Sequence, residues 1–74
     1  MKLSEEEQIR KLKEIGQHSF VTNVKIKTID TLSSYGEKGL HAIAEIADSS
    51  LVTEVKEHAL ATITRVKEES ETKK

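Results

Sequence analysis

The sequence repeats itself once, with a spacing of 31 residues from Ser19 to Ser50. Residues 19–25 read SFVTNVK and residues 50–56 read SLVTEVK, so five of the seven positions are identical. Chance similarity between two amphipathic helices would match the apolar positions, but it would less readily place the same serine, threonine and lysine together. A period of about 20 to 50 residues is typical of repeat architectures, in which each repeat forms one supersecondary unit. This period therefore constrains the fold more than any other feature of the chain.

The same spacing aligns apolar residues on both sides of these two segments. The aligned pairs are Ile9 with Leu40, Leu12 with Ile43, Ile15 with Ile46, Ile29 with Leu60, and Leu32 with Ile63. We therefore predict one helical domain over residues 1–68, built from two units at residues 4–34 and 35–68. Residues 69–74 carry no apolar anchor, and we expect them to form a disordered tail.

Helical periodicity and helix-end signals predict two helices in each unit, joined as an antiparallel hairpin. The predicted helices span residues 4–15, residues 20 or 22 to 34, residues 37–48, and residues 50 or 53 to 68. Ser4 and Glu7 match a capping box at the start of the first helix. Gly16 is expected to end that helix in the left-handed conformation. The chain contains no proline, and the fold class that follows is all-α with four helices.

The residues before the second and fourth helices need a local interpretation. Ser19 or Thr22 is the expected N-cap of the second helix, and Ser50 or Thr53 that of the fourth. Phe20 and Leu51 align at these two entries. We expect both side chains to pack into the core, as a staple or as an inter-helix contact.

Composition excludes several classes of protein. The chain has 74 residues, no cysteine and a net charge of −1. Without a basic excess, a nucleic-acid or membrane-surface protein is disfavoured. No apolar run is long enough to span a membrane, and the acidic N-terminus is unlike a signal peptide. Since small secreted domains tend to be rich in cysteine, we expect a cytoplasmic protein.

The two units resemble short HEAT-like repeats, of the type found in PBS-lyase-type repeat proteins. In that family the second helix of each repeat begins with a Val-Arg pair, followed by a small and then a large apolar residue. Here Val24-Lys25 and Val55-Lys56 stand at the position of the pair, and Thr28 and Ala59 at the small position. The chain departs from the pattern by having lysine in place of arginine and no proline at the helix starts.

What the resemblance implies is a scaffold that presents a ridge of parallel helices to another macromolecule. Only two units are present, whereas at least three are usually needed for a stable stack. A compact four-helix array, or a dimer that completes the stack, would solve the burial problem. We therefore expect a protein-protein interaction module, with a protein partner or a second copy of the chain as its ligand.

Two sets of residues are candidates for the binding surface. The first is a ridge on the first and third helices, made of Arg10, Glu14, His41 and Glu45. The alternative is a nucleic-acid-binding basic face on the second and fourth helices, made of Lys25, Lys27, Lys56 and Arg65. Acidic neighbours dilute the charge of this second set, and two aromatic residues leave little surface on which bases could stack.

The sequence shows no catalytic machinery. No cysteine nucleophile is present, and no serine lies in a Gly-x-Ser-x-Gly turn. His41 with Glu45, and Glu54 with His58, have the i,i+4 spacing that can hold a metal, but no third ligand is indicated. We interpret both as helix-surface pairs. We expect no enzyme activity, no cofactor and no metal.

Overall fold

The computed structural model describes residues 3–72, and within this range the chain is all-α, as the sequence predicts. Its helices are α1 (Glu5–His18), α2 (Thr22–Ser33), α3 (Leu40–Ser49) and α4 (Thr53–Thr72), with a short 3₁₀ helix, η1 (Gly36–Gly39), before α3. Each of the four predicted helices is therefore present. The predicted and observed ends differ, and the differences identify packing that the sequence pattern does not reveal.

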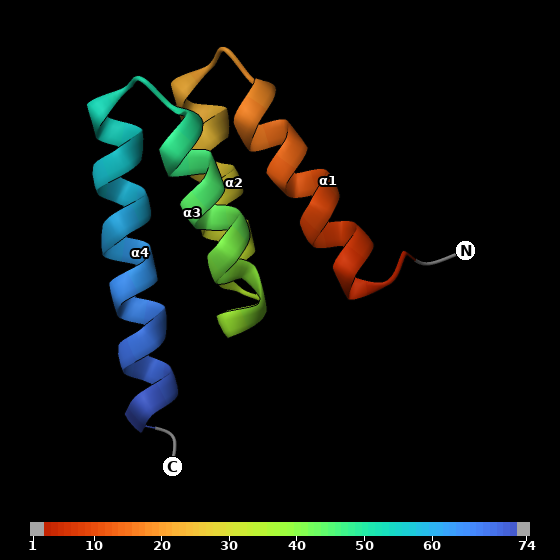
Figure 1. Ribbon diagram of the computed structural model, residues 1–74, viewed down its shortest axis with the longest axis vertical. Coiled ribbons are helices and arrows are strands. Elements are labelled where there is room, and N and C mark those ends of the chain that lie inside the picture. Colours follow the sequence, from red (N-terminus) through yellow and green to blue (C-terminus); the bar gives the residue numbers. More distant parts are fainter. Residues whose placement is uncertain (1–2, 73–74) are drawn as a thin grey trace.

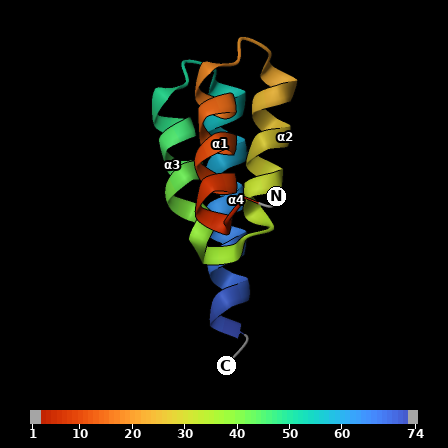
Figure 2. The ribbon, with the colours of Figure 1, turned by 90° about the vertical axis from the view of Figure 1, so that its right-hand side faces the viewer.

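The four helices run alternately up and down (Figure 1). α1 packs against α2, α3 against α4, and the two pairs meet through α1 with α3 and α2 with α4. α1 and α4 lie at opposite sides of the array (Figure 1), and in the view from the α1 side α1 stands in front of α4, with α3 and α2 to its left and right (Figure 2). The α1–α2 and α3–α4 connections are at one end, and the turn through η1 is at the other (Figure 1). The result is a flat array with extents of 38 × 34 × 16 Å.

The two units share local hydrogen bonds at the repeat spacing. The backbone N–H of Val21 donates to Ser19 Oγ at 3.1 Å, and that of Val52 donates to Ser50 Oγ at 3.1 Å. These serines therefore form turns just ahead of α2 and α4. They are not N-caps: Val21 is the N-cap residue of α2, without a side-chain cap, so the prediction of Ser19 or Thr22 was wrong. The carbonyl of Val52 likewise accepts the first helical bonds of α4.

The predicted capping box at the start of α1 is confirmed. The backbone N–H of Glu7 donates to Ser4 Oγ, and that of Ser4 donates to Glu7 Oε1, each at 3.2 Å. Two otherwise unpaired N–H groups at the helix start are satisfied in this way.

Gly16 does not end α1, contrary to the prediction. It lies inside the helix, which continues to His18, and it is buried. A Cβ added at this position would lie 2.9 Å from Ile46 Cγ1, and closer still to Ile46 Cδ1. The glycine therefore permits the close approach of α1 to α3. Without knowledge of this contact, a glycine at the end of an apolar stripe was interpreted as the end of the helix.

α4 is longer than predicted. It passes the predicted end at Glu68 and continues to Thr72, so residues 69–72 of the predicted disordered tail are helical. Val66 is buried and Ser70 is half-buried, which shows that the last turns still lie over the rest of the protein. Residues 73 and 74, the remainder of the predicted tail, lie outside the described residues.

The core lies where the two helix pairs meet. Its largest fully buried side chains are Ile29, Leu32, Ile43, Ile46 and Val55. Phe20 and Leu51, which we expected in the core, are not part of it: their exposed fractions are 100% and 97%. A hydrophobic staple joins the residue before the N-cap to the fourth helical residue. That fourth residue is Lys25 in α2 and Lys56 in α4, so neither apolar side chain has an apolar partner there.

Candidate interaction surfaces

The predicted ridge of Arg10, Glu14, His41 and Glu45 lies on the neighbouring helices α1 and α3. The structure brings His41 and Glu45 together, with 2.6 Å between His41 Nε2 and Glu45 Oε2. The link across to α1 comes from Lys13, whose Nζ lies 3.2 Å from Glu45 Oε1. Sequence reasoning missed Lys13, because its alignment partner is the alanine at position 44 and no repeated charge marks it. Arg10 and Glu14 are exposed on α1.

Ion pairing affects two titratable groups near this face. The hydrogen bond from Lys13 lowers the pKa of Glu45 below its usual 4.5, and the positive charges of Lys13 and His41 act in the same direction against partial desolvation. The hydrogen bond from Lys38 Nζ to Glu5 Oε1, 2.9 Å long, raises the pKa of Lys38 above its usual 10.5. Both ion pairs connect α1 to residues of the second unit.

The predicted basic set does not form one exposed face. Lys25 is buried, and its Nζ donates to the carbonyl oxygen of Gly16 at 3.0 Å and, at 3.5 Å, to that of Gln17. A cation at this place satisfies the last carbonyls of α1 and complements the helix dipole. Lys27 and Lys56 are exposed on α2 and α4.

The remaining basic residue and its surroundings also differ from a phosphate-binding surface. Arg65 is exposed, and its Nη2 donates to Ser33 Oγ at 3.2 Å. Between α2 and α4, Asp30 Oδ1 lies 2.7 Å from His58 Nε2. This pair places a carboxylate on the face where the sequence suggested a basic surface. His58 therefore pairs with Asp30 and not, as predicted, with Glu54.

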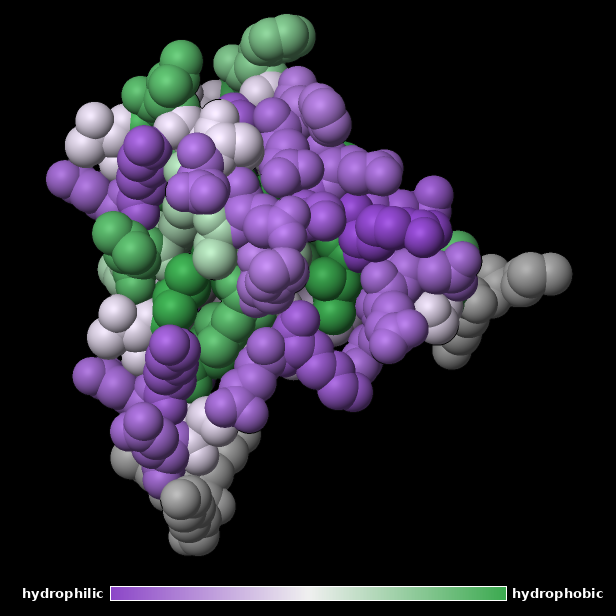
Figure 3. Space-filling model, in the orientation of Figure 1, coloured by the Kyte–Doolittle hydropathy of each residue, from purple (hydrophilic) through white to green (hydrophobic). Residues whose placement is uncertain are grey.

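Four apolar side chains are exposed at the end of the molecule that carries the α1–α2 and α3–α4 connections. We call them the loop-end surface: Phe20, Val21, Leu51 and Val52. Hydrophobic side chains stand over both connections in Figure 3. A hollow of about 360 Å³ lies between them, bordered by polar groups of His18, Ser19 and Ser50 as well as by Phe20 and Leu51.

A second apolar surface is a groove along α3 and α4. It is lined by Ala44, Ala47, Asp48, Lys56, Leu60 and Ile63 and has a volume of about 320 Å³. Leu60 is the most exposed large apolar side chain in it, at 62%. An apolar band over α3 and α4 is visible in Figure 3.

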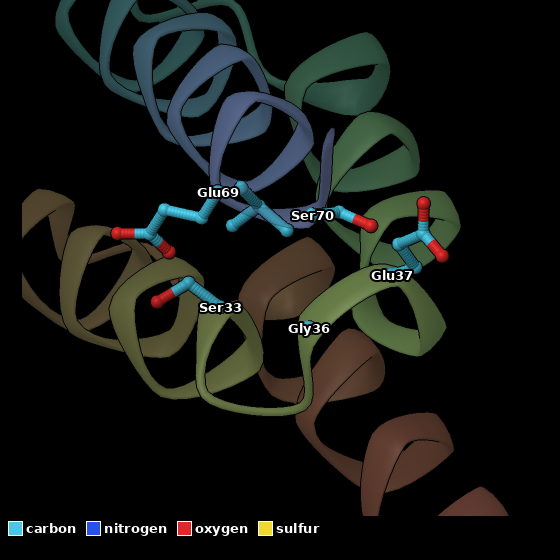
Figure 4. A pocket seen from close by; sticks show the side chains of 6 residues that line it. Ser33, Gly36, Glu37, Glu69 and Ser70 are labelled. Carbon is cyan, nitrogen blue, oxygen red and sulfur yellow. The ribbon is translucent and has the colours of Figure 1, made fainter. Parts of the chain in front are cut away.

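A small polar hollow of about 200 Å³ lies at the opposite end, where the last turns of α4 pass the turn into η1. Figure 4 shows Glu69 beside Ser33 on one side of it and Ser70 facing Glu37 on the other. Gly36, at the bottom, has a φ of 66°, which suits glycine. The hollow forms where the turn into η1 and the last turns of α4 meet, and we assign it no binding role.

Residues 3–72 contain no group of three or more histidine, aspartate or glutamate side chains placed to hold a metal ion. No helix in this range combines the length and apolar character that crossing a membrane requires. No family model, curated protein or solved structure matches the chain.

Proposed function

We propose that this chain is a small HEAT-like helical-repeat module that works in the cytoplasm by binding a protein, and that it is not an enzyme. The observation that carries the proposal is the exposure of Phe20 and Leu51. Fully burying such a side chain is worth about 1.5–3 kcal/mol. Folding gains none of this from either residue, because both remain in water. A partner that covers the loop-end surface would gain it instead.

The loop-end surface has the properties of a protein-binding site. The Ser19 and Ser50 turns hold the two connections in the same conformation, so little ordering entropy is lost on binding. The hollow between Phe20 and Leu51 can receive one apolar side chain of a partner. Polar groups at its border, including Gln17 and His18, can form the hydrogen-bonding rim that surrounds such anchors. The expected ligand is a protein segment with an apolar protrusion and a polar border.

The nucleic-acid alternative has less support. The ammonium group of Lys25 is hydrogen-bonded to a carbonyl near the end of α1, and the Asp30–His58 pair places a carboxylate between α2 and α4. A phosphate-binding surface depends on clustered cations whose counterions are released on binding. The exposed apolar surface at the loop end therefore favours a protein ligand.

Site-specific cross-linking tests the proposal. A photo-reactive amino acid placed at Phe20 is expected to capture a discrete protein from a lysate of the source organism. The added substitution Leu51→Ser should abolish capture while leaving the unfolding midpoint unchanged, since Leu51 makes no core contact. The matched control is the same reactive group at Lys11, an exposed position on α1. The same proteins captured from Lys11, or capture that survives Leu51→Ser, would contradict the proposal.

A further inference from the structure

One face of the first unit is buried by the second unit, while the same face of the second unit is exposed. Ile29 and Leu32 are fully buried, but the aligned residues Leu60 and Ile63 line the α3–α4 groove. Lys25 is buried, and its counterpart Lys56 is exposed. The groove is therefore the surface on which a further unit would pack.

The opposite edge of the array shows the complementary pattern. Ile15 on α1 is 50% exposed, whereas the aligned Ile46 is fully buried. Val24 on α2 is exposed, whereas the aligned Val55 is fully buried. The second unit packs against the first through Ile46 and Val55. The aligned residues of the first unit, Ile15 and Val24, lie exposed at its free edge.

We propose that a second copy of this chain occupies the α3–α4 groove, head to tail. The α1–α2 edge of one copy, with Ile15 and Val24, packs on Leu60 and Ile63 of the next. The template is the interface between the two units of a single chain, which the proposed contact would continue in the same sense. Neither edge includes Phe20 or Leu51, so the inference does not depend on the loop-end surface.

The proposed interface differs from its template at two aligned positions. Inside the chain, Gly16 allows Ile46 to approach closely. Between copies, Ala47 takes the place of Gly16 and Ile15 of the next copy takes the place of Ile46, so the terminal carbon of Ile15 must rotate away from the alanine methyl. Inside the chain, Lys13 pairs with Glu45. The aligned residues are Ala44 and Glu14, so the proposed interface lacks this ion pair. Both differences make the contact between copies weaker than the contact between units.

The geometry is heterologous, because two different surfaces meet. A heterologous contact that does not close into a ring adds copies without limit, whereas a two-fold contact stops at a dimer. The expected behaviour is a mean mass that rises continuously from 8.3 kDa as the concentration increases. Sedimentation equilibrium measures this directly.

A complementation experiment tests the head-to-tail arrangement. Leu60→Asp inactivates the groove, and Ile15→Asp inactivates the opposite edge; both side chains are at least half exposed, so the fold is kept. Each variant alone should be monomeric. An equimolar mixture should form a dimer and grow no further, because one copy supplies the intact groove and the other the intact edge. Phe20→Ser is the matched control and should associate like the wild type.

A gain of affinity provides the second arm. Ala44→Lys should restore the missing partner of Glu14 and strengthen association about two- to five-fold, as an exposed ion pair does. Ala44→Glu should weaken it. The proposal is overturned if the wild type stays monomeric up to about 1 mM. It is also overturned if the mixed variants stay monomeric, or if the wild type stops at a dimer. Loss of partner capture in Phe20 variants that still self-associate would affect only the loop-end proposal.

Discussion

Substituting Gly16 by alanine tests whether α1 and α3 are packed as closely as the structure shows. In an isolated helix, this change stabilises by about 1 kcal/mol, since glycine has the higher conformational entropy. Here the new Cβ would lie 2.9 Å from Ile46 Cγ1, which is close to the backbone and cannot swing away freely. Overpacking of this kind costs about 1–3 kcal/mol. The packing cost should exceed the helix gain, for a net loss of about 1 kcal/mol.

Urea unfolding followed by far-UV circular dichroism measures this loss, and a thermal scan should show a decrease of about 4–8 °C in Tm per kcal/mol. A double-mutant cycle with Ile46→Val sharpens the test, because valine lacks the carbon closest to the new methyl. Alone, Ile46→Val should cost about 0.5–1.5 kcal/mol. In the Gly16→Ala background, Ile46→Val should destabilise by about 0.5–1 kcal/mol less than it does in the wild type.

The matched control is Gly36→Ala. Gly36 has a positive φ, and nothing lies within 4 Å of an added Cβ, so this change should destabilise through the backbone alone and show no coupling to Ile46. If Gly16→Ala stabilises the protein, or if the cycle with Ile46→Val is additive, the close approach of α1 and α3 is refuted.

Three further predictions compare aligned positions or follow from pairing. Ile29→Ala should cost about 2–5 kcal/mol, because a buried side chain is lost, whereas Leu60→Ala should stay within about 0.5 kcal/mol in dilute urea titrations; equal losses would contradict the burial pattern. Lys25→Met should lower the free energy of unfolding by about 1–3 kcal/mol, because carbonyls of α1 lose their donor. Lys56→Met should be close to neutral in the same titrations. A neutral Lys25→Met would show that water replaces the ammonium group as the donor. Because the pKa of Glu45 is lowered on folding, its contribution is present above pH 4.5 and lost as the pH falls below that value. The urea midpoint of the wild type should therefore exceed that of Glu45→Gln at pH 7, and the two should converge in acid; a constant difference would exclude ionisation of Glu45 as its source.

Local patterns in the sequence were enough to predict the helices. The four helices follow from apolar periodicity, and the Ser4–Glu7 capping box follows from a motif contained within four residues. The predictions that failed depend on distant segments. Gly16 is needed because Ile46 lies against it, and α4 continues past Glu68 because its end lies over the η1 turn. Neither neighbour can be read from the residues beside the position concerned.

The candidate surfaces were harder to predict, because the repeat aligns residues but not their surroundings. Lys25 and Lys56 are aligned, yet Lys25 is buried, with its ammonium on the carbonyls of α1, and Lys56 is exposed. Phe20 and Leu51 were assigned to the core on hydrophobicity alone. The signal that corrects them was present in the chain: a lysine stands at the staple position of both helices, so an apolar residue before each N-cap had no local partner.

The two proposed surfaces have a joint consequence. Head-to-tail association would repeat the loop-end surface once per copy, and a partner carrying two docking segments would then bind with avidity. Leu60→Asp would reduce the apparent affinity for such a divalent partner by on the order of tenfold or more, although residue 60 lies outside the loop-end surface. A monovalent segment would bind the wild type and Leu60→Asp equally. Surface plasmon resonance with monovalent and tandem segments separates the two cases. Equal loss for both would mean that Leu60 contributes to the docking site itself, which would make the groove and the loop end one surface.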